Sequence, residues 1–303
     1  MISRRAFLER SSLALAAMTC LQANAAGKTG PLGKPIGIQL YTVRNETKKD
    51  LLGTLKSIAA IGYSEVELAG YYDKSAKELG KLLSDLGLKA TSTHQGLADL
   101  LQETQRKIDF VAELGVKNLV IPFPAVADNL FANQAPGAAK TIANSMTLDD
   151  WKWIAEQLNA IGAMSAKAGI VTGYHNHNME FRTIDGKVAF DQLLAWTDPA
   201  LVTMELDIAW VVTAGFDPVA YLKKYPERIS LLHVKDVKKG VPILVDKVET
   251  VTTEVGRGQI DWETLFAACD PKHIKHYYVE QEHYERPAVD AVRISYDFLT
   301  KLA

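Results

Sequence analysis

The chain has 303 residues, 48% of them hydrophobic, and a formal net charge of −2 at pH 7. This balance argues against a nucleic-acid-binding protein, because such proteins carry basic patches that contact phosphates. The length, with no Pro/Gly/Ser-rich linker, allows one large barrel or two modest domains and favours a single domain.

Residues 1–27 have the features of a twin-arginine export signal. Arg4 and Arg5 precede Phe7 and Leu8, the apolar run 13–21 follows, and Ala23-Asn24-Ala25 resembles a cleavage site. The apolar run is too short to span a bilayer. We therefore predict a folded protein that is periplasmic or otherwise exported through the twin-arginine route, without a stable membrane anchor. Cleavage would remove Cys20 and leave Cys269, so no internal disulfide is expected.

From residue 35 onward, short apolar runs alternate with amphipathic stretches, a pattern typical of βα units and a parallel sheet. Eight such pairs are predicted. The strands are expected at 36–41, 65–68, 89–94, 118–121, 170–175, 202–207, 229–234 and 276–280. The helices are expected near 47–61, 74–86, 97–114, 147–168, 189–196, 217–224, 260–269 and 287–301.

Local signals support several helix ends. Thr147 followed by Asp149 and Asp150 is typical of a capped helix start with carboxylates in its first turn. A glycine follows each of four predicted helices, where a left-handed residue is favoured. These glycines are Gly62, Gly87, Gly115 and Gly169.

Eight βα units within residues 33–303 indicate an α/β fold, a single-domain (β/α)₈ TIM barrel, whose chemistry lies at the carboxyl ends of the strands. An open doubly wound sheet is the alternative, but no glycine-rich phosphate loop follows the first strand. Two long connections, 122–146 and 236–259, leave carboxyl ends of strands and are candidate lids.

The predicted strands end on polar groups that an ordinary apolar strand does not need. Side chains two residues apart share a face of a strand, so these groups are expected to converge at one mouth of the barrel. Buried carboxylates and imidazoles are costly unless a cation or substrate satisfies them. The groups are Gln39 and Tyr41, Glu65 and Glu67, His94, His175 and His177, Glu205 and Asp207, His233 and Lys235, and Glu280 and Glu282.

A divalent metal would satisfy such a cluster. Asp207, His233, Glu280 and one histidine of Tyr174-His175-Asn176-His177 form a mixed nitrogen and oxygen set. That set suits Mn²⁺, Zn²⁺, Co²⁺ or Mg²⁺. We predict one divalent ion per chain.

The ordered motifs resemble the xylose isomerase-like TIM barrel superfamily of sugar phosphate isomerases and epimerases, over nearly the whole chain after the signal segment. The resemblance implies a small-molecule sugar as substrate, no nucleic acid, and leaves a homo-oligomer open. The motifs are Gly37-Ile38-Gln39-Leu40-Tyr41, Gly173-Tyr174-His175-Asn176-His177 with Glu180-Phe181, Glu205-Leu206-Asp207-Ile208-Ala209-Trp210, His233-Val234-Lys235-Asp236, Gly256-Arg257-Gly258 and Val279-Glu280-Gln281.

The ketose 3-epimerases of this superfamily hold a metal with Glu, Asp, His and Glu, and the two glutamates move the proton. Carried over, Asp207, His233 and Glu280 fill the last three places, and the first falls on His175 or, by a small shift, on His177. Because a histidine replaces the first glutamate, Glu280 is expected to share acid–base work with Glu180 or His177. Lys235 is expected to stabilise negative charge on the substrate oxygen.

The resemblance implies a metal-dependent isomerase or epimerase that works through an enediolate of a sugar, inosose or keto-sugar. Expulsion of a substituent from the same intermediate would make the chain a lyase or dehydratase, by 3-keto-glycoside cleavage or inosose dehydration. A non-catalytic periplasmic sugar-binding or partner protein is the alternative of another class. Substrate contacts are expected from Tyr41, Glu67, His94 and Trp210.

Overall fold

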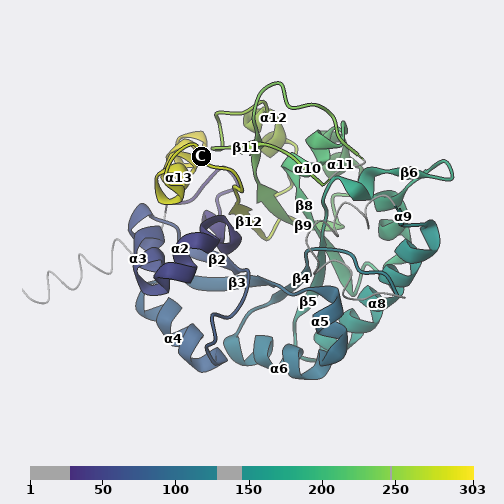
Figure 1. The fold of residues 1–303 in the computed structure, drawn as a ribbon, viewed down its shortest axis with the longest axis horizontal. Coiled ribbons are helices and arrows are strands. Elements are labelled where there is room, and N and C mark those ends of the chain that lie inside the picture. Colours follow the sequence, from purple (N-terminus) through teal and green to yellow (C-terminus); the bar gives the residue numbers. More distant parts are fainter. Residues whose placement is uncertain (1–27, 128–144, 246–247) are drawn as a thin grey trace, which may run out of the picture.

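The computed structural model describes residues 28–127, 145–245 and 248–303. Eight parallel strands form a closed barrel in which successive strands of the chain are neighbours and the last pairs with the first (Figure 1). The predicted single-domain TIM barrel is thus confirmed. The strands are β1 (Gly37–Gln39), β2 (Glu65–Leu68), β3 (Lys89–His94), β4 (Asn118–Ile121), β5 (Val171–His175), β8 (Val202–Asp207), β9 (Ile229–Val234) and β12 (His276–Val279).

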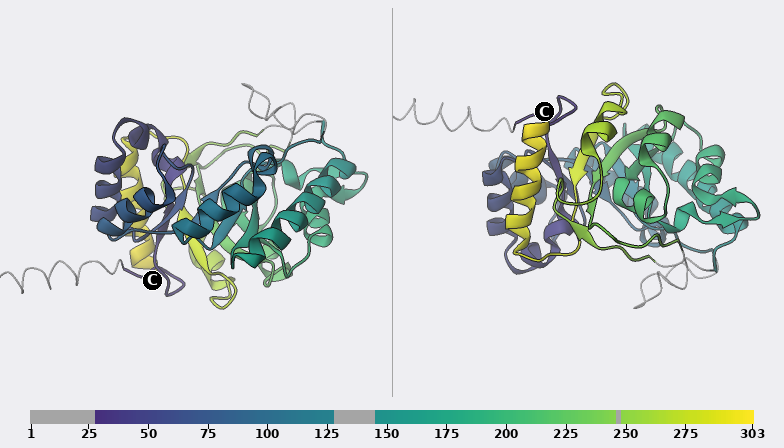
Figure 2. Two further views of the ribbon diagram at one scale, coloured as in Figure 1. Left: turned by 90° about the horizontal axis from the view of Figure 1, so that it is seen from below. Right: turned by 90° about the horizontal axis from the view of Figure 1, so that it is seen from above.

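The helices surround the barrel, as the two side views in Figure 2 show. One helix after each barrel strand belongs to this outer layer: α3 (Leu51–Ile61), α4 (Ala76–Asp85), α6 (Thr104–Leu114), α8 (Leu148–Lys167), α9 (Ala189–Trp196), α11 (Pro218–Lys224), α12 (Trp262–Ala267) and α13 (Ala288–Leu302). Additional helical elements are η1 (Leu40–Val43), α2 (Arg44–Lys49), α5 (Leu97–Gln102), η3 (Met179–Phe181) and α10 (Ile208–Thr213). Two small antiparallel pairs complete the fold: β6 (Thr183–Ile184) with β7 (Lys187–Val188), and β10 (Asp236–Val237) with β11 (Thr252–Thr253).

The predicted helix signals are present. Thr147 forms a capping box with Asp150 at the start of α8. Gly62, Gly115 and Gly169 follow α3, α6 and α8 with positive φ angles, as does Gly87 after α4. The predicted signal segment and most of the connection 122–146 lie outside the described residues.

The first strand ends earlier than predicted. The side chain of Gln39 accepts a hydrogen bond from the backbone N–H of Tyr41 at 2.9 Å, and residues 40–43 turn into a 3₁₀ helix instead of continuing the strand to residue 41. This turn places Tyr41 at the rim of the barrel, where its side chain is 44% exposed.

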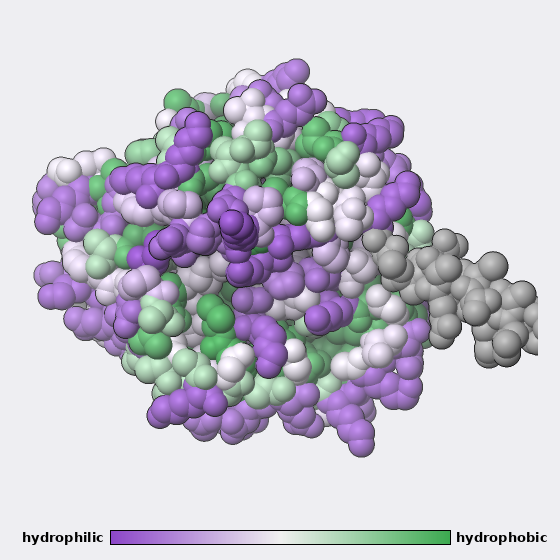
Figure 3. Space-filling model, turned by 180° about the vertical axis from the view of Figure 1, so that it is seen from behind, coloured by the Kyte–Doolittle hydropathy of each residue, from purple (hydrophilic) through white to green (hydrophobic). Residues whose placement is uncertain are grey.

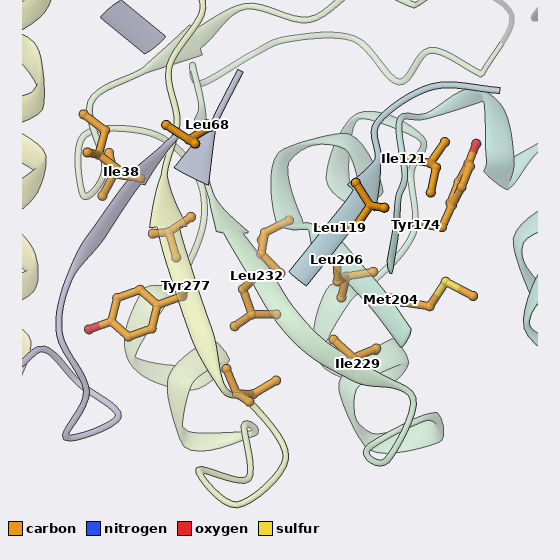
Figure 4. Packing of buried hydrophobic residues seen from close by; sticks show 14 of the residues in the cluster. Ile38, Leu68, Leu119, Ile121, Tyr174, Met204, Leu206, Ile229, Leu232 and Tyr277 are labelled. Carbon is orange, nitrogen blue, oxygen red and sulfur yellow. The ribbon is translucent and has the colours of Figure 1, made fainter. Parts of the chain in front are cut away.

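Apolar residues fill two separate regions. Alternate side chains of the strands, such as Leu119, Leu206 and Leu232, point away from the barrel and belong to the large core shared with the helices (Figure 4). A second, small cluster consists of Val120, Leu231 and Tyr278. Their neighbours two residues further along β9 and β12, His233 and Glu280, are polar and buried. The barrel interior therefore changes from apolar to polar towards the carboxyl ends of its strands.

On the face seen in Figure 3, hydrophobic residues form small patches among polar ones. None of the described helices is long and apolar enough to cross a membrane.

Candidate active site

A cavity of about 580 Å³ opens where the strands end. Side chains at or just after the ends of seven of the eight strands line it, which is the position expected for the active site of a TIM barrel. Among the predicted site residues, Tyr41, His94, His175, His177, Lys235 and Glu280 line the cavity, whereas Glu67, Glu180, Asp207, Trp210 and His233 do not.

Three imidazoles meet one carboxylate beneath this cavity. Oε2 of Glu205 lies 2.8 Å from Nε2 of His94, 3.1 Å from Nδ1 of His175 and 3.1 Å from Nε2 of His233. We call His94, His175, Glu205 and His233 the Glu205 group; one ligand atom from each lies within 4.8 Å of all the others. Oε1 of Glu205 is buried and has no hydrogen-bond partner among the described residues.

A second group shares His233. Asp207, His233 and Glu280, here the Glu280 group, also offer ligand atoms within 4.8 Å of one another. The Nδ1 atom of His233 lies 3.0 Å from Glu280 and 3.7 Å from Asp207. His233 therefore faces the Glu205 group with one ring nitrogen and the Glu280 group with the other.

Lys235 already neutralises the carboxylates of the Glu280 group. Its buried ammonium lies 2.9 Å from Asp207, 2.6 Å from Glu280 and 2.8 Å from Glu282. Burial opposes the positive charge, but Asp207 and Glu280 hold the pKa of Lys235 well above its usual value. Burial also raises the pKa of Glu280, yet Lys235 and His233 lower it below the usual range, so Glu280 is ionised.

Glu67 contacts two histidines of the Glu205 group, His94 and His233. Its Oε2 atom accepts a hydrogen bond from Gln39 at 2.7 Å and lies 2.6 Å from His233 and 3.2 Å from His94. Burial raises the pKa of Glu67, but His94 and His233 hold it well below the usual range. Because Glu67 is fully buried and does not line the cavity, its contacts are to protein groups rather than to the space open to a substrate.

The histidines of the Glu205 group differ in charge. Burial lowers the pKa of His94, but Glu67 and Glu205 raise it to about 9. Burial also lowers the pKa of His233, but the charges of Glu205 and Glu280 raise it well above its usual value. Burial, followed by the charge of His233, holds the pKa of His175 well below its usual value. Protons thus supply positive charge between these carboxylates.

His177 and Trp210 lie side by side above β5 and β8, with ring centroids 5.0 Å apart. Burial, then the charge of Lys235, lowers the pKa of His177 to about 3, so this ring is neutral near pH 7. Nδ1 of His177 and Nε1 of Trp210 are buried without hydrogen-bond partners among the described residues. His177 reaches the cavity, and Trp210 packs behind it with its face 5.2 Å from the Lys235 ammonium.

Glu180 is fully buried away from the cavity, so the structure does not place it where the predicted acid–base role needs it. Its carboxylate accepts hydrogen bonds from the hydroxyl of Tyr174 at 2.7 Å and from the backbone N–H of His177 at 2.9 Å. Burial raises the pKa of Glu180 to about 7. Its visible effect is to fix the backbone of His177.

Glu180→Gln is expected to change how stability depends on pH. In the wild type, the unfolded carboxyl loses its proton near pH 4.5 while the folded one keeps it to about pH 7, so stability falls as pH rises through this window. Glutamine does not titrate, so the variant should gain up to about 3 kcal/mol relative to wild type between pH 4.5 and 8. Urea unfolding at both pH values measures the difference. The exposed Glu156→Gln is the control, and a constant difference for Glu180→Gln would contradict the expectation.

The Glu280 group contains three of the predicted metal ligands, and a second candidate set for a metal ion is the Glu205 group. It offers three imidazoles and a carboxylate with an unpartnered oxygen, a donor set suited to a first-row divalent metal. Of the predicted ligands, His175 and His233 belong to it, whereas Asp207 and Glu280 pair with Lys235. Glu205 was absent from the predicted ligands, although its spacing of two residues from Asp207 puts both side chains on one face of β8.

The chain is similar in sequence and in structure to known proteins. The model of the family described as "Xylose isomerase-like TIM barrel" matches residues 55–302. An inosose dehydratase from Clostridium beijerinckii is 27% identical over 233 residues, which cover 71% of this chain and 76% of that protein. The crystal structure of a sugar phosphate isomerase/epimerase from Parabacteroides distasonis is 27% identical and superposes with a TM-score of 0.72, covering 91% of this chain and 94% of the other.

A more distant structure shares the fold. It is the IolI protein with a bound zinc atom, which is 17% identical, has a TM-score of 0.64, and covers 88% of this chain and 97% of its own.

Proposed function

The chain belongs to the xylose isomerase-like TIM barrel family, and from this premise we propose that it is a metal-dependent enzyme that moves a proton beside the carbonyl of a sugar, inosose or keto-sugar. The observation that carries the proposal is the buried Glu205 group beneath a cavity lined by ionisable side chains. The printed names of the relatives, an inosose dehydratase and a sugar phosphate isomerase/epimerase, agree with this class of chemistry.

We propose one divalent ion, held by His94, His175, Glu205 and His233. Bound there, a divalent ion would act as a Lewis acid that polarises a carbonyl and makes the neighbouring C–H acidic. His94 and His233 hold protons between carboxylates, so this position already accommodates positive charge, as a metal ion would require. Among Mn²⁺, Zn²⁺, Co²⁺ and Mg²⁺, a ligand set rich in imidazole suits Zn²⁺ or Mn²⁺ better than Mg²⁺.

Two groups on the cavity wall are placed to transfer protons. Glu280, which is ionised, follows β12, and His177, which is neutral, follows β5. Two strands, β9 and β8, lie between β12 and β5, so the two groups approach the cavity from well-separated positions around the barrel. We propose that Glu280 removes the proton and that His177 gives its ring N–H proton to another face or another carbon, which results in epimerisation or isomerisation. Glu280 then releases the proton it took to solvent, and His177 takes one up from solvent, so both groups return to their starting states.

Lys235 is placed to stabilise negative charge that develops on a substrate oxygen, because its ammonium lines the cavity beside Glu280. Tyr41, on the exposed rim, is proposed to contact the substrate. Trp210 would act through His177 and Lys235, against which its ring packs.

The second candidate is a lyase or dehydratase. It is favoured by the inosose dehydratases among the relatives, which align with about three quarters of this chain. The same groups serve this reaction if His177 protonates a leaving hydroxyl or alkoxide instead of a carbon.

Export through the twin-arginine route stays a prediction, since residues 1–27 lie outside the described part of the chain.

Incubating the metal-loaded protein in D₂O with free ketoses, inososes and 3-keto-glycosides tests the proposal. We expect solvent deuterium to enter one class of sugar beside its carbonyl, detected by mass spectrometry and NMR. Deuterium in an intact sugar of changed configuration supports an isomerase or epimerase, and release of water or an aglycone supports a lyase. Binding of a sugar without any exchange would overturn the proposal in favour of a non-catalytic sugar-binding protein.

A further inference from the structure

A second cleft, of about 710 Å³, adjoins the catalytic cavity. It lies among η1, α2, the start of α3, the loop after β2, and α4, which group together on the left of Figure 1. Tyr41 and Ala69 line both the cleft and the catalytic cavity. Tyr41 therefore forms a wall between the two spaces, so a molecule held in the catalytic cavity can extend past this ring into the cleft.

The cleft is positively charged, although the chain as a whole is not. Its lining includes four cationic side chains and one acidic one, in a chain whose formal net charge is −2. None of the four cations forms a salt bridge with a carboxylate of the described residues. Their field is therefore available to an anion from outside. The cations are Arg44, Lys48, Lys49 and Lys74, and the acid is Asp73.

Arg44 is held in place at the boundary between the two spaces. Its guanidinium lies 4.2 Å from the centroid of the Tyr41 ring and donates hydrogen bonds to the backbone carbonyls of Tyr41 at 2.9 Å and Glu282 at 3.4 Å. A guanidinium has five N–H donors in a planar fork that matches carboxylate and phosphate oxygens. Two of its three nitrogens are occupied by carbonyls, so donors remain for an anion.

Part of the cleft lining is apolar, and part comes from an unusual turn. Tyr72 and Asp73 both have positive φ angles, 55° and 54°, and the turn is closed by a hydrogen bond from Lys74 to Tyr71. Such backbone costs free energy outside glycine and persists where the surroundings demand it. Tyr72 and Lys74 of this turn line the cleft, as do Leu51 and Leu52 of α3.

We propose that this cleft is a subsite for the part of the substrate remote from the reacting carbons, and that this part is an apolar or ring-shaped group bearing a carboxylate or phosphate. That the bound group is part of a substrate rests on the proposed function. The binding of an acidic ring compound in the cleft does not depend on that function. Arg44 would bind the acidic group at the boundary, Lys48, Lys49 and Lys74 would add attraction, and Tyr72 with the leucines would contact the ring.

The test uses benzoate and phenyl phosphate as acidic probes and benzamide as the neutral counterpart. Each is titrated by calorimetry into the metal-loaded full chain at low ionic strength, where charge effects are least screened. We expect at least one anion to bind about tenfold or more tightly than benzamide. Tighter binding of benzoate indicates a site for a carboxylate, and tighter binding of phenyl phosphate indicates a site for a phosphate.

A matched pair of double variants locates the binding. Lys48→Gln with Lys49→Gln removes two charges from the cleft, and Lys56→Gln with Lys77→Gln removes two exposed charges from α3 and α4 that do not line it. The first pair is expected to weaken anion binding about fivefold or more, the second less than about twofold. Equal losses in both pairs, or anions that bind no better than benzamide, would overturn the inference.

The outcome is separable from that of the proposed function. Anion binding in the cleft is expected to survive His233→Ala, which removes a side chain common to both ionisable groups but absent from the cleft. If the wild-type protein turns over no sugar of the panel but still binds the anions in the cleft, the catalytic proposal alone is overturned. If a sugar of the panel reacts, its acidic conjugate should show about tenfold higher kcat/KM, and the Lys48/Lys49 double variant should remove that advantage.

Discussion

His233→Ala is expected to lower metal affinity by about a hundredfold or more and to remove detectable activity on any substrate of the wild type. The reason is geometric, since His233 is the one described side chain present in both the Glu205 group and the Glu280 group. Its two ring nitrogens lie 3.1 Å from Glu205 and 3.0 Å from Glu280. Equilibrium dialysis followed by elemental analysis measures the metal bound per chain.

The matched control is His276→Ala. His276 is also a barrel histidine paired with a carboxylate, Glu65 at 2.7 Å, but it begins β12 and so lies at the amino ends of the strands. This variant should keep its metal. If both variants bind metal as the wild type does, neither group of His233 is the metal site.

A second pair of variants separates the two groups. Glu205→Gln should weaken metal binding strongly if the ion lies among the three imidazoles around Glu205, whereas Asp207→Asn should weaken it more if the ligand set expected from the sequence is correct. The comparison decides between the groups because each substitution preserves side-chain size.

Lys235→Met is expected to destabilise the metal-free protein by about 3–5 kcal/mol, because it removes one partner of a buried charge cluster and leaves the others unpaired. The side chain of Lys235 is 1% exposed, and its ammonium contacts Asp207, Glu280 and Glu282, of which the first is fully buried. Methionine retains most of the apolar stem, so the loss reports on charge. Urea unfolding at pH 7 measures the free energy.

Lys238→Met is the control for this experiment. Lys238 pairs with Glu285, but both side chains are more than half exposed, so the change should cost less than about 1 kcal/mol. Equal losses in the two variants would show that the charges around Lys235 are solvated rather than buried.

The barrel itself was predictable because its signals are local. Strand, helix and cap positions follow from periodicity, from Thr147 and from glycines such as Gly115. The location of the site also followed, since strand-end polar residues must converge when parallel strands close into a barrel. The early end of β1 was not predictable from periodicity, because it depends on the Gln39 side chain bonding the backbone of Tyr41.

The pairing of histidines with carboxylates depended on the stagger of the strands. Sequence spacing puts Glu205 and Asp207 on one face of β8, but not at the same depth, and only the barrel register shows that Glu205 meets three imidazoles while Asp207 meets Lys235. Glu180 illustrates the same limit. Its motif suggested catalysis, whereas the structure turns its carboxylate towards the hydroxyl of Tyr174, away from the cavity.

The most direct test of the account is the metal dependence of proton exchange. The protein is stripped with a chelator, divided, and reloaded with Mn²⁺ or Zn²⁺ in one half, and both halves are given the reactive sugar in D₂O. The account predicts that deuterium enters the carbon beside the carbonyl with the reloaded protein, and that the stripped protein and reloaded His233→Ala give none. Equal exchange by the stripped and reloaded proteins would contradict it.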